Sequence, residues 1–175
     1  KTILELGQEN EQKIQKIQLN KWLAAIVNRF VIENGLTDKS VQNNVDKLTS
    51  VCGDPEQLKH VIMNLLSNSM HYANTDYNPF VTITVDEEKT DSETYIIISD
   101  NGPGIAENIR DKIFEPFFTT SSTGNGLGLY IARKVCLNND GYLDYIPSKA
   151  GKSFFRMTLP GNGTCRNISS DSKQD

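Results

Sequence analysis

Residues 94–105, TYIIISDNGPGI, decide the fold class and locate the candidate site. The first half is a nearly continuous apolar run, which indicates a buried strand. Asp100 ends this strand on the same side as Ile96 and Ile98, and Gly102 and Gly104 follow at once. Glycines at these positions let other backbone or a ligand approach closely. Taken alone, the Asp-Asn-Gly segment can equally be a simple turn.

The segments around this strand predict the rest of a sheet. Residues 80–86, FVTITVD, alternate as a strand, and the polar residues that follow predict an antiparallel hairpin with the central strand. Residues 142–146 and 153–159 predict two further strands, and residues 40–52 carry a weak signal for a short strand pair. The helix-rich first part and the strand-rich later part predict an α+β fold, with helices on one face of a mixed, mostly antiparallel sheet.

A helix with explicit start signals is predicted from residue 55. Asp54 is the expected N-cap, Pro55 takes the first helical position, and Gln57 completes a capping box. One face is expected to be a buried stripe, formed by Leu58, Val61, Ile62, Leu65, Leu66 and Ser69. Beside it, Asn64, Asn68 and His71 fall in line, so this helix presents three polar groups to something.

Two further helices are expected, one from Leu19 to Gly35 and one opened by Gly126. We expect residues 1–17 to be the end of a preceding helix and a linker, 18–160 to be the main domain, and 161–175 to be a disordered tail. A net charge of -4 argues against general nucleic-acid binding. The three cysteines, Cys52, Cys136 and Cys165, lack zinc or redox spacing and are expected to be reduced thiols.

Four segments need one common explanation: the Asn64/Asn68 helix, residues 100–105 (DNGPGI), residues 114–118 (FEPFF) and residues 124–129 (GNGLGL). Each has a structural alternative alone, but together and in this order they resemble the histidine-kinase branch of the ATPase superfamily shared with gyrase, Hsp90 and MutL. They are similar to its N, G1, F and G2 boxes. The resemblance covers about residues 18–160 and implies a two-layer α/β sandwich of the Bergerat type. ATP would bind between the helix and a short lid, residues 119–123, whose base Phe117 and Phe118 are expected to anchor in the core.

The resemblance also implies the cofactors, ATP and Mg²⁺, and the residues that hold them. Asp100 matches the carboxylate that accepts a hydrogen bond from the adenine amino group, and Asn68 matches the Mg²⁺ ligand. Ser69 replaces the usual alanine and is expected to matter little. Lys112 matches a basic position near the γ-phosphate. The implied nucleotide contacts are Asn64, Asn68, His71, Tyr72, Asp100, Gly102, Gly104, Ile105, Thr123, Gly124, Asn125, Gly126, Leu127 and Gly128.

Asn64 indicates the reaction. Related ATPases carry a glutamate there that activates water, whereas an amide has no useful basicity. Phosphoryl transfer to a histidine, with Asn64 and Lys112 in catalytic positions, therefore fits better than hydrolysis. Neither His60 nor His71 lies in an acceptor-type context, so the acceptor is expected on separate dimerisation helices of a parent protein.

The expected partners are ATP, those helices and a response regulator. We expect a cytoplasmic, monomeric piece with no nucleic-acid or direct membrane contact, from a homodimeric parent that an inner-membrane anchor would suit. The short lid and QLNKWL at residues 18–23 are similar to the nitrogen- and pilus-regulation sensor kinases. Two alternatives stay open. One is a serine/threonine kinase of the anti-sigma-factor type, and the other is a nucleotide-responsive binding module, or pseudokinase.

Overall fold

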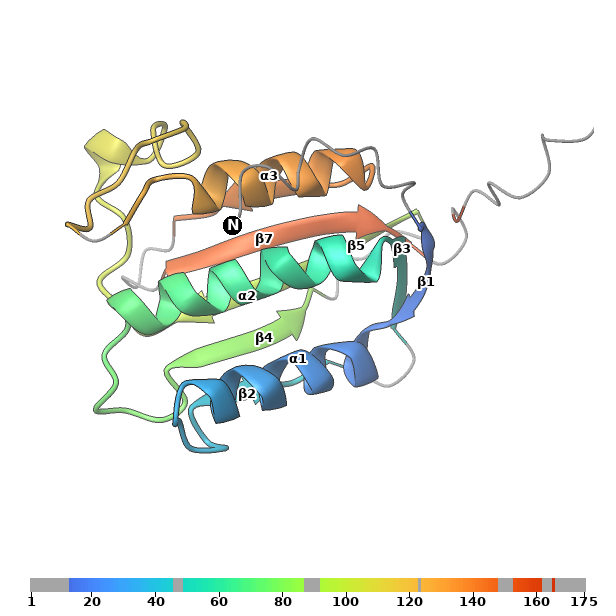
Figure 1. Cartoon of the computed structure of the whole chain (residues 1–175), viewed down its shortest axis with the longest axis horizontal. Helices are drawn as coiled ribbons and strands as arrows, with labels where there is room; N and C mark the ends of the chain where they lie inside the picture. The colour runs from blue at the N-terminus through green and yellow to red at the C-terminus, as the bar shows by residue number, and fades with distance from the viewer. Residues whose placement is uncertain are drawn as a thin grey trace, which may run out of the picture.

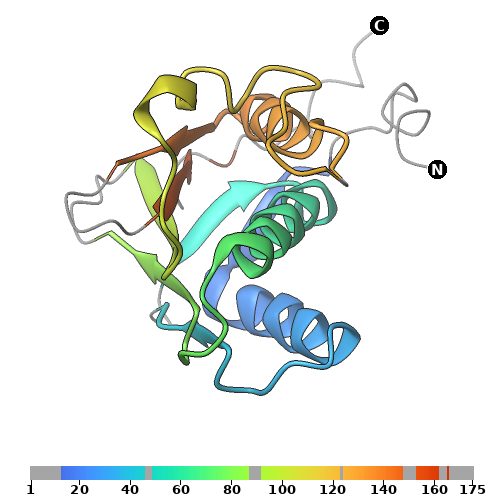
Figure 2. The same cartoon turned by 90° about the vertical axis from the view of Figure 1, so that its left-hand side faces the viewer.

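A five-stranded sheet, covered on one face by helices, forms the body of the molecule (Figures 1 and 2). The structure is a computed structural model, and it describes residues 13–45, 49–86, 92–122, 124–147, 153–161 and 165. The sheet order is β2 (Val41–Asn43), β4 (Val81–Val85), β5 (Glu93–Asp100), β7 (Ser153–Pro160) and β6 (Tyr142–Tyr145). The covering helices are α1 (Leu19–Glu33), α2 (Pro55–Tyr72) and α3 (Gly128–Asn138).

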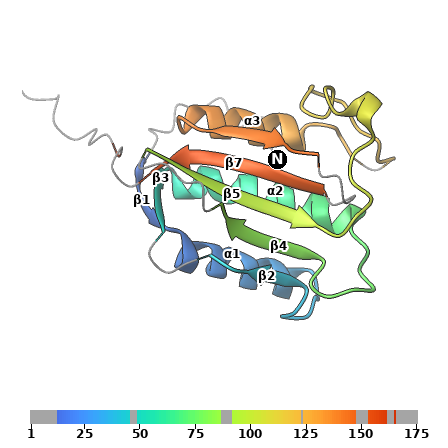
Figure 3. The same cartoon turned by 180° about the vertical axis from the view of Figure 1, so that it is seen from behind.

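The pairing confirms a mixed, mostly antiparallel sheet. β2 runs parallel to β4, and the other neighbouring pairs are antiparallel. Seen from behind, the strands lie in front of the helices, so the helices occupy a single layer (Figure 3). The α+β fold class expected from the sequence is confirmed. None of the helices in the described ranges is long and apolar enough to cross a membrane.

The core lies between the sheet and the layer of helices, and β5 and α2 both contribute to it. Side chains of β5 alternate between buried and partly exposed, as expected for a strand with one face against helices. Ile96 and Ile98 are at most 1% exposed and lie on the face that the helices cover. The opposing apolar stripe of α2, which its helical periodicity predicts, is fully buried at Leu58, Ile62, Leu65 and Leu66. Burying one such side chain contributes about 1.5–3 kcal/mol, so this contact fixes α2 on the sheet.

A small second sheet corrects two expectations for the N-terminal part. Residues Gln15–Gln18 form strand β1, antiparallel to β3 (Ser50–Gly53), and Ile17 is buried rather than part of a helix end or linker. Strands do form within residues 40–52, but β2 pairs with β4 and β3 pairs with β1, so they do not pair with each other. The alternation of side chains indicates a strand without indicating its partner.

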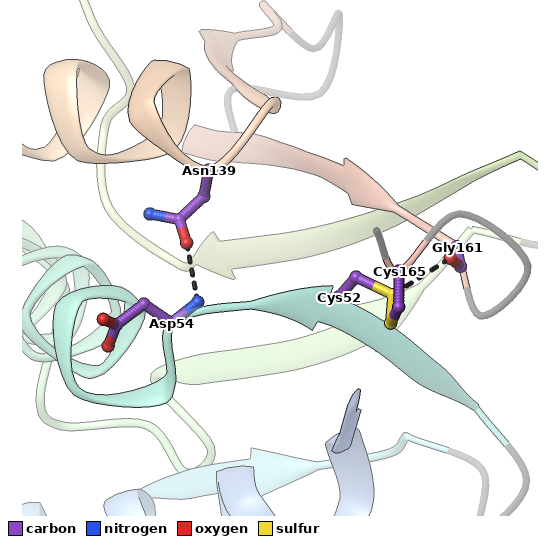
Figure 4. The surroundings of a disulfide bond; sticks show 5 residues. All are labelled: Cys52, Asp54, Asn139, Gly161 and Cys165. Carbon is purple, nitrogen blue, oxygen red and sulfur yellow. Dashed lines mark hydrogen bonds between the residues drawn. A yellow bond between two sulfur atoms is a disulfide. The ribbon is translucent and has the colours of Figure 1, made fainter. Parts of the chain in front are cut away.

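The start of α2 is held by an asparagine from another helix (Figure 4). The Asp54 carboxylate accepts from the backbone N–H groups of Glu56 and Gln57 at 3.0 and 3.1 Å, so the predicted N-cap is confirmed. The second half of the capping box is wrong. The Asp54 N–H donates to Asn139 Oδ1 at 2.7 Å, and the Gln57 side chain accepts from Asn139 Nδ2 at 3.2 Å. Asn139, 2% exposed at the end of α3, thereby joins the two helices.

A disulfide joins Cys52 of β3 to Cys165, whose Cα atoms lie 5.3 Å apart (Figure 4). The expectation of three reduced thiols is therefore wrong for this pair. Cys136 is free and buried, and burial raises the pKa of its thiol to about 12. Beside the disulfide, Val51 bridges to Gly161, which brings the end of β7 next to β3. The spacing of the cysteines along the sequence could not indicate that β3 and the end of β7 lie next to each other.

Candidate nucleotide-binding site

A cavity of about 550 Å³ opens at one end of the sheet, between the second half of α2, the segment after β5 and the segment before α3. Its size is that of a small-molecule site. The structure brings eleven of the sequence-predicted residues to its lining: Asn64, Asn68, His71, Tyr72, Asp100, Gly104, Ile105, Gly124, Asn125, Gly126 and Gly128. Gly102, Leu127 and Lys112 are outside the lining, and Thr123 lies outside the described residues.

Asp100 lies at the base of this cavity and is only 7% exposed. Its Oδ1 accepts from the Gly102 N–H at 2.9 Å, and its Oδ2 accepts from the Ser69 hydroxyl at 3.3 Å. Burial raises the pKa of the Asp100 carboxyl, and these two hydrogen bonds oppose the rise. Ser69, for which the sequence predicts little importance, makes one of the contacts that hold the carboxylate. Gly102 does not line the cavity, but its N–H donates to the Asp100 carboxylate and helps to hold it.

The backbone of Ile105, beside Asp100 in the cavity, is held at both of its polar groups. Its N–H donates to the Tyr145 hydroxyl at 3.1 Å, and its carbonyl oxygen accepts from Arg110 Nε at 2.9 Å. The Tyr145 ring packs edge-on against Phe155, which also lines the cavity, with 5.7 Å between ring centroids. Sequence reasoning missed Tyr145 and Phe155, because a strand residue 40 positions from Ile105 gives no local signal of this contact.

The polar residues of α2 face the cavity as their helical spacing predicts. Asn64 lines the cavity, and its Nδ2 is buried and has no hydrogen-bond partner within the described residues. A buried amide of this kind needs an acceptor, which a bound ligand or water can supply. A Cβ atom added to Gly128 would meet the Asn64 Oδ1. Glycine at residue 128 therefore makes room for the Asn64 side chain over the start of α3.

The glycine-rich segment brings an uncapped helix end to the cavity. Gly126 has φ 67°, and a Cβ there would lie 2.7 Å from the Phe117 carbonyl oxygen and from the Phe118 nitrogen, so this position requires glycine. α3 begins at Gly128, two residues later than predicted, and its N-cap residue Leu127 makes no side-chain capping bond. The first N–H groups of a helix, with the positive end of its dipole, favour an anion.

The lid segment departs from its prediction at one of two phenylalanines. Phe118 is partly buried against the core and lines the cavity, as expected. Phe117 is 74% exposed, so its expected place in the core is wrong. Its backbone has φ 66°, a left-handed conformation that is uncommon for residues other than glycine. Across the cavity mouth, the hydroxyls of Tyr72 and Thr120 share a hydrogen bond of 3.1 Å, which links the end of α2 to the lid.

The residues present fit a magnesium ion that arrives with a phosphate ligand. Within the described ranges, no group of three or more His, Cys, Asp or Glu residues could hold a metal ion. Asn68 lines the cavity and offers one amide oxygen. Mg²⁺ commonly takes one or two protein oxygens and completes its shell with water and substrate phosphates. A single amide ligand is therefore sufficient if phosphate oxygens share the ion.

Comparisons with known proteins agree with this geometry. The model of the family described as "Histidine kinase-, DNA gyrase B-, and HSP90-like ATPase" matches residues 53–163, which is more than half of the chain. The chain belongs to this ATPase family. The resemblance predicted from the four sequence segments is confirmed, and so is the fold that it implies.

The relatives of this family member include a sensor protein kinase and a sporulation kinase. The sensor protein kinase PilS of Pseudomonas aeruginosa is 30% identical over 160 residues, which cover 90% of this chain and 30% of PilS. Sporulation kinase E of Bacillus subtilis is 34% identical over 119 residues, or 66% of this chain and 15% of that protein. The chain spans about a third or less of the length of the curated relatives it matches.

Solved structures show the same fold. The catalytic domain of histidine kinase ThkA has a TM-score of 0.68 at 24% identity, and the match covers 85% of this chain and 96% of that one. The mycobacterial sensor histidine kinase MprB gives the same score and identity over 84% and 97%. At this identity the likeness is one of architecture.

Proposed function

We propose that this chain is the ATP–Mg²⁺-binding catalytic domain of a sensor histidine kinase. It would hold ATP while the γ-phosphate passes to a histidine on a separate helix of the parent protein. The observation that supports this proposal most strongly is that one cavity combines a buried carboxylate at Asp100, the amides of Asn64 and Asn68, and the uncapped start of α3. These groups suit an adenine, a metal-bound triphosphate and its negative charge, respectively.

The chemistry of the lining supports transfer over hydrolysis. Asp100 is the one carboxylate among the described residues that line the cavity, and each of its oxygens already accepts a hydrogen bond. Activation of water needs a free base near the γ-phosphate, and the amide of Asn64 cannot act as a base. A neutral imidazole needs no such base, because one ring nitrogen already carries a lone pair. The proposed step forms a nitrogen–phosphorus bond and breaks the bond to the bridging oxygen of ADP, which leaves with the electron pair.

In this step the protein acts by position and charge. Bound Mg²⁺ would neutralise charge on the phosphate oxygens. Asn68 would orient the triphosphate, the first N–H groups of α3 would stabilise its charge, and the buried Nδ2 of Asn64 would donate to a phosphate oxygen. His71 stays a predicted phosphate contact. Lys112, exposed on the segment that leads into the lid, also stays a predicted contact for the γ-phosphate.

The proposal includes the partners and the setting. The parent would be a homodimer, with dimerisation helices that carry the acceptor histidine and a response regulator that takes the phosphate onward. As part of the proposal, the main domain spans residues 18–160 and is extended at its N-terminal end by β1, from Gln15. The residues before β1 would lead from the dimerisation helices, and residues 161–175 stay a predicted tail, in which Cys165 is bonded to Cys52. We also place the domain in the cytoplasm, where its ATP is found. Because that compartment is reducing, Cys52 and Cys165 would pair there only under oxidising conditions.

The direct test combines the chain with a separately made acceptor-helix fragment of the parent and γ-labelled ATP. Label that is lost in acid and retained in base marks phosphohistidine and supports the proposal. Acid-stable label on a serine or threonine would support the anti-sigma-factor type of kinase instead. Nucleotide binding with no transfer to any acceptor would support a binding module. An Asn68→Ala variant serves as the control that should bind Mg²⁺–ATP poorly and transfer little label.

A further inference from the structure

The contact between Ser69 and Asp100 connects two parts of the cavity that come from different elements. Ser69 lies on the buried face of α2 and is 2% exposed. Its hydroxyl donates to Oδ2 of Asp100, at the end of β5, over a distance of 3.3 Å. Asp100 itself is 7% exposed. A hydrogen bond between two buried groups holds their relative position more firmly than one in solvent, because no water competes for it.

The other hydrogen bond to the carboxylate, from the Gly102 N–H, cannot hold Asp100 in place relative to α2. The Gly102 N–H comes from two residues further along the same loop, so it turns together with Asp100. The Ser69 hydroxyl, by contrast, fixes the carboxylate relative to α2. The preceding residue on that helix is Asn68, which lines the cavity. The bond therefore sets the distance and orientation between the carboxylate and the amides of α2.

The hydroxyl also determines which hydrogen bonds Asp100 can make. It donates to a carboxylate oxygen, and donation favours the ionised form, which is a pure acceptor. An acceptor pairs with the exocyclic amino group of a 6-aminopurine and repels the carbonyl oxygen of a 6-oxopurine. A protonated carboxyl would present an O–H group, which pairs with that carbonyl. Loss of the Ser69 donor would therefore weaken the distinction between the two kinds of base.

We propose that Ser69 is a positioning residue that keeps Asp100 oriented as a hydrogen-bond acceptor and thereby sets the preference of the cavity for 6-aminopurine nucleotides. This inference rests on the proposed nucleotide-binding function and extends it to base selectivity. It assigns a role to Ser69, which is the one polar residue in the otherwise apolar buried stripe of α2.

The pH dependence of binding follows from the surroundings of Asp100. Burial raises the pKa of Asp100, and the Gly102 and Ser69 hydrogen bonds oppose that rise. Removing the Ser69 hydroxyl would raise this pKa further, so binding of a 6-aminopurine would fail at a higher pH. Among described lining residues, the other titratable side chains are His71 and Tyr72, both from α2. The neighbours of Asp100 in β4 and β7 are Val81 and Ser153, which carry no titratable group.

The test compares Ser69→Ala with the wild-type chain in calorimetric titrations of Mg²⁺–ADP and Mg²⁺–GDP from pH 5 to pH 8. We expect about tenfold weaker ADP binding at pH 7, which corresponds to one hydrogen bond to a charged group. We also expect GDP binding to be unchanged or tighter, and the acidic limit of ADP binding to move to higher pH. His71 is present in both proteins, so a difference between the two profiles reports on Asp100.

Ser99→Ala is the matched control. Ser99 precedes Asp100 in β5, but its hydroxyl lies 3.5 Å from the Thr82 carbonyl oxygen, away from Asp100, so its removal should change neither profile. A Ser69→Ala variant with the wild-type ADP/GDP ratio and pH profile would overturn the inference. Equal weakening of ADP and GDP with an unmoved acidic limit would overturn it too, since that marks a merely structural role. A wild-type chain that binds no ADP at any pH would instead contradict the proposed function on which the inference rests.

Discussion

The substitution Asp100→Asn removes one charge and one acceptor from the base of the cavity while it keeps the size of the side chain. The structure indicates how the new amide would sit. Its oxygen would face the Gly102 N–H, which now donates to Oδ1 at 2.9 Å, because the opposite orientation would set two donors against each other. The NH₂ group would then replace Oδ2, where Ser69 now donates.

The loss of binding free energy can be worked from these contacts. The lost hydrogen bond from the adenine amino group to the charged carboxylate contributes about 1.5–3 kcal/mol. Leaving that buried amino group without an acceptor adds about 1–3 kcal/mol. The sum is at least about 2.5 kcal/mol, which weakens nucleotide binding by roughly 70-fold or more.

The folding stability of Asp100→Asn at neutral pH, unlike its nucleotide affinity, should not decrease. Because the folded-state pKa of Asp100 lies above its unfolded value, the folded chain holds this proton more tightly. The stabilisation is complete below the unfolded pKa and is lost as pH rises through the folded pKa, so ionised Asp100 opposes folding at neutral pH. Asp100→Asn should therefore keep or raise the melting temperature at pH 7 and lose that advantage at acidic pH.

The assay measures Mg²⁺–ATP affinity by calorimetry and stability by thermal denaturation on the same samples. Asp144→Asn, on the partly exposed carboxylate near Arg133 and Arg156, is the control for removal of one charge outside the cavity. Affinity within threefold of wild type would refute the adenine assignment of Asp100. A large fall in melting temperature would refute the account of its burial.

Three further predictions concern other parts of the molecule. Gly128→Ala should displace the Asn64 side chain and weaken Mg²⁺–ATP binding about tenfold or more without lowering the melting temperature, because alanine favours helix; unchanged affinity in calorimetry would contradict this. Asn139→Ala should destabilise the fold by about 2–4 kcal/mol in urea denaturation, since it leaves the buried Asp54 N–H unpaired, whereas the exposed Asn138→Ala should have little effect; equal effects would refute the role of Asn139. Reduction of the Cys52–Cys165 disulfide, which closes a separation of 113 residues, should remove about 4–5 kcal/mol in the chain-entropy model and lower the melting temperature by roughly 10 °C, while a Cys165→Ser variant should not respond to reductant; an equal response would place the effect elsewhere.

Local signals in the sequence predicted most of the fold. The N-cap at Asp54 is confirmed because its partners are two and three residues away. The central strand and the helix of Asn64 and Asn68 are confirmed because alternation and helical periodicity depend only on neighbours along the chain. The four motifs together predicted both the cavity and the family, although α3 begins two residues later than predicted and Phe117 is exposed.

What the sequence missed depends on contacts between distant residues. Asn139 meets Asp54 across 85 positions, Tyr145 meets Ile105 across 40, and Ser69 meets Asp100 across 31. No periodicity records such pairs. Phe117 shows another limit. Its apolar side chain predicts burial, whereas the side chain is 74% exposed on a backbone of left-handed conformation, which the local sequence does not indicate.

The central claim, that this chain holds ATP through Mg²⁺ and selects adenine, is tested most directly by one calorimetric comparison. The chain is titrated with ATP and with GTP, each in the presence of Mg²⁺ and again with the metal chelated. We expect one ATP site per chain, binding that weakens when Mg²⁺ is removed, and GTP affinity at least about tenfold lower. No measurable binding of Mg²⁺–ATP, or equal affinity for ATP and GTP, would contradict it.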